Sequence, residues 1–148
     1  MNTYTELLRH YVAALAYRLD KVLVNAPQDF GALDLGGGVR TPAGILAHVG
    51  DVLVWASGRL TGAAREPHSP GTWSEETVRV GAIIATLDSA LVEGKDADAA
   101  TALKLLQGPL ADAMTHVGQL AMQCRIAGRP IPGENFYEAP IAALGTEP

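Results

Sequence analysis

The sequence predicts an all-α protein, a four-helix bundle, because its apolar residues recur at helical spacing and almost never alternate. Hydrophobic residues make up 48% of the 148 positions, which is enough to bury one core. We therefore expect a single domain spanning residues 1–148. Stretches rich in Gly and Pro separate the apolar segments without interrupting them. Four main helices joined by such loops are typical of a bundle.

The first two helices are predicted at residues 3–23 and from Thr41 to about Gly62. An apolar stripe follows helical spacing through the first of them. Thr41 suits an N-cap, and Pro42 after it is favoured at the first helical position. The loop between the two helices contains three consecutive glycines at 36–38. These follow no predicted strand and match no phosphate-binding pattern, so we expect a flexible loop.

The remaining helices are marked by capping and breaking residues. The third is predicted to begin at Ser74, with acidic residues in its first turn, and to end at Gly94. A short helical segment at 97–107 comes next. After a break or kink at residues 108–109, a last helix runs to Ala127. The tail beyond it is expected to be extended.

Charge and cysteine content exclude several function classes. The formal net charge is −5 and the basic residues are scattered, so we expect no nucleic-acid or membrane partner. The N-terminus lacks the basic-then-apolar order of a signal peptide, and no apolar run approaches the roughly 20 residues of a membrane span. The lone cysteine, Cys124, fits a reducing compartment, and we expect a cytoplasmic protein. Its apolar neighbours predict a core residue rather than a nucleophile.

The last helix carries the residues that point to chemistry. At about 100° per residue, one narrow polar stripe contains Asp112, His116, Gln119 and Gln123 on an almost uncharged helix. A solvent-facing helix normally has a broad charged face, so we expect this stripe to face a partly enclosed space. Burying a carboxylate and imidazoles is costly unless they are paired or bind metal. Asp112 and His116 lie four residues apart and can reach one ion.

A third ligand should come from a neighbouring helix. His48 is the best candidate because it lies on the apolar side of the second helix, whereas His10 falls on a polar face and His68 in a loop. We therefore predict one divalent metal ion held by His48, Asp112 and His116. Two imidazoles and one carboxylate suit zinc, iron or nickel and leave positions open. The structural alternative is a hydrogen-bonded core histidine beside a chance Asp-x-x-x-His spacing.

Several segments resemble the DinB/YfiT-like family of metal-dependent enzymes. Segment 40–49 (RTPAGILAHV) is similar to the family's second helix, with His48 as its metal histidine. Segment 107–120 (QGPLADAMTHVGQL) is similar to the ligand-bearing helix, and residues 127–131 and 134–137 are similar to the tail of one subgroup. The resemblance implies a DinB-like bundle of up-down-down-up topology.

In many members of that family, the ligand helix carries two histidines four residues apart, and Asp112 stands where the first would be. The resemblance therefore implies a subgroup with aspartate in place of one metal histidine. The predicted metal is zinc or nickel, with iron and manganese as alternatives. The aspartate lowers the net charge of the centre by one and should make a metal-bound water less acidic. Members with known activity mostly use a low-molecular-weight thiol such as bacillithiol, mycothiol or glutathione. A thiol-dependent S-transferase acting on a small electrophilic molecule is the implied function.

Two other functions stay open. A metal-dependent hydrolase would need no thiol, although no further carboxylate obviously suits a general base. A non-catalytic bundle that binds metal or a small ligand is the other alternative. The sparse charge of the last helix also favours packing against a second subunit, so we expect a homodimer. No catalytic residue is assigned, and the residues predicted to contact a small-molecule substrate are Gln119, Trp55, Arg40, Asn135 and Tyr137.

Overall fold

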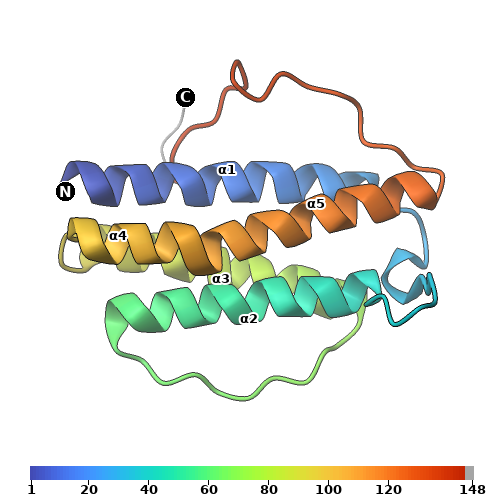
Figure 1. The fold of residues 1–148 in the computed structure, drawn as a ribbon, viewed down its shortest axis with the longest axis horizontal. Coiled ribbons are helices and arrows are strands. Elements are labelled where there is room, and N and C mark those ends of the chain that lie inside the picture. The colour runs from blue at the N-terminus through green and yellow to red at the C-terminus, as the bar shows by residue number, and fades with distance from the viewer. Residues whose placement is uncertain (146–148) are drawn as a thin grey trace.

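The computed structural model describes residues 1–145, which form four long helices and, within that range, no strand (Figure 1). The predicted all-α fold class is confirmed. Residues 146–148 of the predicted single domain lie outside the described residues. The fourth long helix, called the C-terminal helix below, is continuous but consists of three segments. The first elements are α1 (Thr3–Asn25), the 3-10 turn η1 (Phe30–Ala32), α2 (Pro42–Thr61) and α3 (Trp73–Glu93). The C-terminal helix consists of α4 (Ala99–Leu105), the π turn η2 (Leu106–Leu110) and α5 (Ala111–Ile126).

Figure 1 shows α1 and the C-terminal helix running in one direction and α2 and α3 in the other. Two consecutive helices that run the same way need a connection that returns along the bundle. The 20 residues of α2 span about 30 Å at 1.5 Å per residue. Residues 62–72 can extend over about 36 Å, which is long enough. They run along the outside of the bundle without forming a helix.

Side-chain caps fix the helix starts close to their predicted positions. Thr41 caps α2 through its hydroxyl group, as predicted. The third helix begins at Trp73, one residue earlier than predicted, because Thr72 and Glu75 form a reciprocal capping box. The same helix ends before Gly94, at the predicted place, although Gly94 is extended rather than left-handed.

The break predicted at residues 108–109 takes the form of a π turn. Pro109 has no N–H group and cannot make the ordinary helical hydrogen bond. The N–H of Ala111 donates to the carbonyl of Leu106, five residues earlier, so the helix widens but continues. Asp112 follows the end of this widened turn by two residues.

The core lies between the four long helices and is apolar. Leu8, Leu46, Leu53 and Leu120 are fully buried in it. Cys124 is buried as well, which confirms it as a core residue, and burial raises the pKa of its thiol. Among the described residues, no helix has the length and apolar content that crossing a membrane requires.

A charged network ties the connection between α2 and α3 to both helices. The carboxylate of Glu76 is only 1% exposed. It accepts hydrogen bonds from Nε2 of His68 at 2.7 Å, from the N–H of Gly71 at 2.7 Å and from Nη1 of Arg79 at 3.1 Å. Arg79 also donates to Asp51 of α2 at 2.7 Å. Burial raises the pKa of Glu76, but its three partners outweigh burial and hold that pKa below its ordinary value.

The tail after α5 forms no helix or strand up to residue 145 and returns beside α1 (Figure 1). Glu134 and Phe136 are among the tail residues that anchor it. Glu134 accepts a hydrogen bond from the hydroxyl of Tyr17 at 2.6 Å and forms an ion pair with Lys21. The guanidinium carbon of Arg18 lies 3.7 Å from the centre of the Phe136 ring. The tail is therefore held on the α1 side of the bundle.

Candidate metal centre

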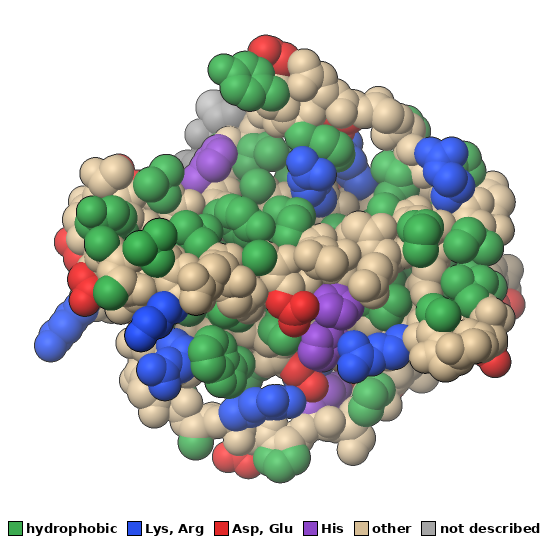
Figure 2. All heavy atoms as spheres, viewed as in Figure 1, with side chains coloured by type: hydrophobic (Ala, Val, Ile, Leu, Met, Phe, Trp, Pro, Cys, Tyr) green, Lys and Arg blue, Asp and Glu red, His purple; other side chains and the backbone are tan. Residues whose placement is uncertain are grey.

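His48, Asp112 and His116 come together between α2 and α5. His48 lies near the start of α2, and the other two lie one turn apart on α5. Each offers one donor atom, and these atoms all lie within 4.8 Å of one another. Figure 2 shows histidine and acidic side chains gathered on the face between these two helices. The three residues could therefore hold one metal ion.

The distance between two of the donor atoms fits a tetrahedral ion. Bonds of about 2.0–2.2 Å at the tetrahedral angle place neighbouring donor atoms about 3.3–3.6 Å apart. Nε2 of His48 lies 3.3 Å from Oδ2 of Asp112, which is within this range. The other carboxylate oxygen of Asp112 lies 3.3 Å from Nδ1 of His116. The carboxylate thus lies within reach of both rings.

A hydrogen bond determines which nitrogen of His116 is free to bind metal. Nδ1 of His116 lies 2.8 Å from the backbone carbonyl oxygen of Asp112. A carbonyl has no proton to donate, so Nδ1 must carry the hydrogen. The neutral ring then keeps a lone pair on Nε2. Metal-binding histidines commonly donate their other N–H to a carbonyl in this way, which fixes the ring orientation. The donor set therefore fits a divalent ion.

Two of the candidate ligands, His48 and Asp112, line an open cavity of about 420 Å³. The His116 side chain is 12% exposed, against 31% for His48 and 44% for Asp112. A cavity of this volume suits a small molecule. Gly108 and Pro109 of the π turn form part of its wall. The lining residues are His48, Asp51, Val52, Trp55, Arg65, Gly108, Pro109 and Asp112.

Two charged residues of the lining, Asp51 and Arg65, were not predicted from the sequence. The sequence offered no further carboxylate that obviously suits a general base, but Asp51 lines the cavity, three residues after His48 on the same helix face. The three-residue spacing from His48 could have predicted that Asp51 lies beside the ligands. Its two oxygens are bonded to arginines, Oδ1 to Arg79 at 2.7 Å and Oδ2 to Arg65 at 3.2 Å. Arg65 comes from the irregular connection, where no periodic pattern could locate it.

Of the five residues predicted to contact substrate, Trp55 alone lines this cavity, and 47% of its surface is exposed. Gln119 is exposed on α5, and Arg40 is exposed directly before α2. Asn135 and Tyr137 belong to the tail, and Tyr137 is 92% exposed. Because the tail is anchored to α1, the structure does not bring these two residues to the cavity.

We compared the chain with models of known protein families, with curated proteins and with solved structures, and none of these matched. The family resemblance of segments 40–49 and 107–120 therefore stays a prediction. The function has to be argued from the candidate metal centre and the cavity beside it.

Proposed function

We propose that the protein is a DinB-like, metal-dependent S-transferase that joins a small electrophilic molecule to a low-molecular-weight thiol. The observation that carries this proposal is the group His48, Asp112 and His116 beside a cavity of about 420 Å³. The directions of the four long helices support the DinB-like part, because they follow the expected up-down-down-up order. The proposed partner is a small molecule, and the homodimer stays a prediction.

The proposed ligands would hold one divalent ion, zinc or nickel, with iron and manganese as alternatives. Bound there, the ion would favour the thiolate form of a thiol, which is the nucleophilic form. His116 would bind through Nε2, since its Nδ1 is engaged with the Asp112 carbonyl. Asp112 would be the only negatively charged residue among the three proposed ligands.

The walls of the cavity would orient the two substrates. Trp55 and Val52 offer an apolar surface to the electrophile. In the transfer, the thiolate sulfur attacks an electrophilic carbon, a carbon–sulfur bond forms, and the leaving group departs with its electron pair. The thiol proton passes to solvent. Because the cavity is open, neither substrate needs the helices to move apart.

Metal-dependent hydrolysis is a second candidate, and the position of Asp51 is the observation that favours it. A carboxylate in the cavity could act as a general base. Both oxygens of Asp51 already bond to Arg65 and Arg79, however. A carboxylate held in this way is poorly placed to take a proton, so the transferase is the better-supported function.

Replacing His48 with Ala is expected to lower the rate of thiol conjugation at least about 100-fold. Losing a ligand should cost more than losing a group that only orients one, which typically costs about 10–100-fold. Conjugation of chlorodinitrobenzene with bacillithiol, mycothiol and glutathione can be followed by absorbance. His10→Ala is a matched control, because His10 is exposed on α1 and outside the cavity.

The assay separates the candidate functions. Turnover in wild type that is lost in His48→Ala, kept in His10→Ala and dependent on added thiol supports the transferase. Hydrolysis of ester or amide substrates at the same rate without thiol would contradict it. Equal thiol conjugation by His48→Ala and wild type would remove the proposed ligands from the reaction.

A further inference from the structure

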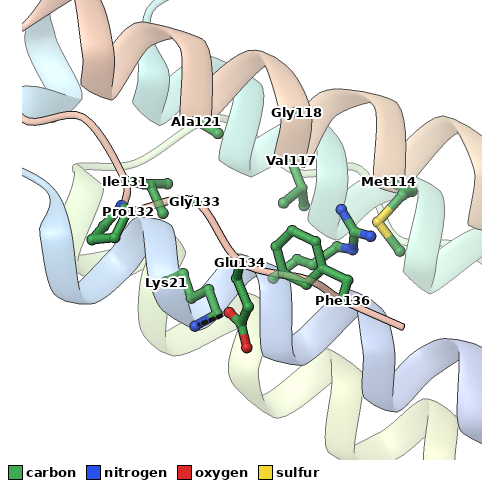
Figure 3. A pocket seen from close by; sticks show the side chains of 11 residues that line it. Lys21, Met114, Val117, Gly118, Ala121, Ile131, Pro132, Gly133, Glu134 and Phe136 are labelled. Carbon is green, nitrogen blue, oxygen red and sulfur yellow. Dashed lines mark ion pairs between the residues drawn. The ribbon is translucent and has the colours of Figure 1, made fainter. Parts of the chain in front are cut away.

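A second cavity, of about 350 Å³, lies on the other side of α5 from the candidate metal centre, between α5, α1 and the tail (Figure 3). The candidate metal ligands on α5 face α2, whereas this cavity faces α1. Figure 3 shows Val117 and Met114 of α5 directed toward the same space as Phe136 of the tail. The α5 side of the cavity is therefore apolar, and its volume suits a small molecule.

Small residues on α5 keep this space open. Gly118 and Ala121 contribute to its lining, and a Cβ added to Gly118 would meet no atom within 4 Å. On the other side, the tail is held to α1 through Glu134, which bonds to Tyr17 and Lys21. These bonds thus hold the tail across the groove.

The lining carries one net positive charge, although the whole chain carries −5. Its charged residues are Arg18, Lys21 and Glu134. Lys21 and Glu134 neutralise each other in an ion pair. Hydrogen bonds from Lys21 and Tyr17 hold the pKa of Glu134 below its ordinary value, so this carboxylate stays ionised at neutral pH. The remaining charge belongs to Arg18, which lies close enough to Glu134 that its charge also lowers the pKa of this carboxylate.

The guanidinium of Arg18 has donors left for a ligand. Its face lies against the ring of Phe136, with 3.7 Å between the guanidinium carbon and the ring centre. Stacking uses the face of the group, whereas its N–H donors point outward in its plane. Within residues 1–145, no ion pair or hydrogen bond of this guanidinium is found. A carboxylate is one of the groups that such a planar set of donors binds through two parallel hydrogen bonds.

We propose that this cavity binds a small carboxylate with an apolar aryl or alkyl body. The carboxylate would pair with Arg18, and the body would lie against Val117 and Met114, over Gly118. The site shares no lining residue with the cavity beside His48. It does not depend on the proposed transferase activity.

Titration calorimetry with phenylbutyrate and its neutral analogue phenylbutyramide tests this site in the full chain. Wild type is expected to bind phenylbutyrate saturably and at least about tenfold more tightly than the amide, because of the charged hydrogen bonds to Arg18. Gly118→Leu should fill the cavity and abolish binding of both. Gly81→Leu is the matched control, since Gly81 is also an exposed helical glycine with no atom within 4 Å of an added Cβ. Both changes favour the helix, so both variants should fold.

A third variant separates charge recognition from simple apolar binding. Arg18→Gln is expected to weaken phenylbutyrate binding at least about tenfold while changing amide binding less than about twofold. Binding of phenylbutyrate to Gly118→Leu as tight as to wild type would overturn the site. Equal affinity of wild type for acid and amide would overturn the carboxylate assignment, and so would the absence of saturable binding at millimolar phenylbutyrate.

Discussion

Replacing Glu76 with Gln is expected to lower the free energy of unfolding by about 3 kcal/mol at pH 7. The side chain is 1% exposed, and its oxygens accept hydrogen bonds from His68, Gly71 and Arg79. An amide at this position would keep one acceptor oxygen, but its NH2 group would face donors in place of the other oxygen, and Arg79 would lose its charged partner on α3. Urea unfolding followed by circular dichroism measures the difference. Glu93→Ala, an exposed change on the same helix, should alter stability by less than about 0.5 kcal/mol.

The effect of Glu76→Gln should depend on pH. The pKa of Glu76 is lower in the folded protein than the value of about 4.3 expected for an unfolded chain. Its contribution to stability is therefore fully present above the unfolded pKa and is lost as the pH falls through the folded pKa. The gap between wild type and Glu76→Gln should narrow below about pH 4. A gap that is the same at pH 7 and pH 3 would show that the carboxylate charge is not what stabilises this network.

Replacing Asp112 with Ala is expected to weaken zinc binding at least about 100-fold. Its two oxygens each lie 3.3 Å from an imidazole nitrogen, so the variant loses the only anionic member of the group. Asp112→His should keep the affinity within about tenfold of wild type, since imidazole is also a competent zinc ligand. Competition with a chromogenic chelator measures both affinities. Asp20→Ala, an exposed change on α1, is the control.

Two results would contradict this role of Asp112. One is a zinc affinity in Asp112→Ala that equals the wild-type value. The other is a metal-free protein that becomes more stable in Asp112→Ala and gains no stability from added zinc. In that case the Asp112 carboxylate would destabilise the fold without binding metal. The polar residues of α5 would then serve packing or ligand binding.

Much of the fold could be predicted from the sequence, because helices leave a periodic signal. The Thr41-Pro42 start of α2 and the break near Pro109 come from local backbone chemistry, which does not depend on the rest of the chain. The spacing of Asp112 and His116 on one helix face is equally local. The position of His48 opposite them follows from the apolar face of α2, because that face must pack against the neighbouring helices.

The parts that could not be predicted depend on single long-range contacts. Glu75 and Glu76 look alike in the sequence, yet one caps α3 and the other is buried beneath the connection from α2. The path of the tail depends on the hydrogen bond from Tyr17 to Glu134 and on the contact between Arg18 and the Phe136 ring. A periodic pattern in the sequence does not predict such contacts. For this reason the sequence could not show that Asn135 and Tyr137 lie away from the cavity beside His48.

The most direct test of the central claim is elemental analysis by mass spectrometry of protein purified without an affinity tag, with His48→Ala prepared in parallel. We predict about one equivalent of zinc or nickel, or else of iron or manganese, per wild-type chain, and loss of this metal from the variant. No metal in wild type after purification and reconstitution would contradict the metal centre. Equal metal in wild type and His48→Ala would show that the ion is held elsewhere.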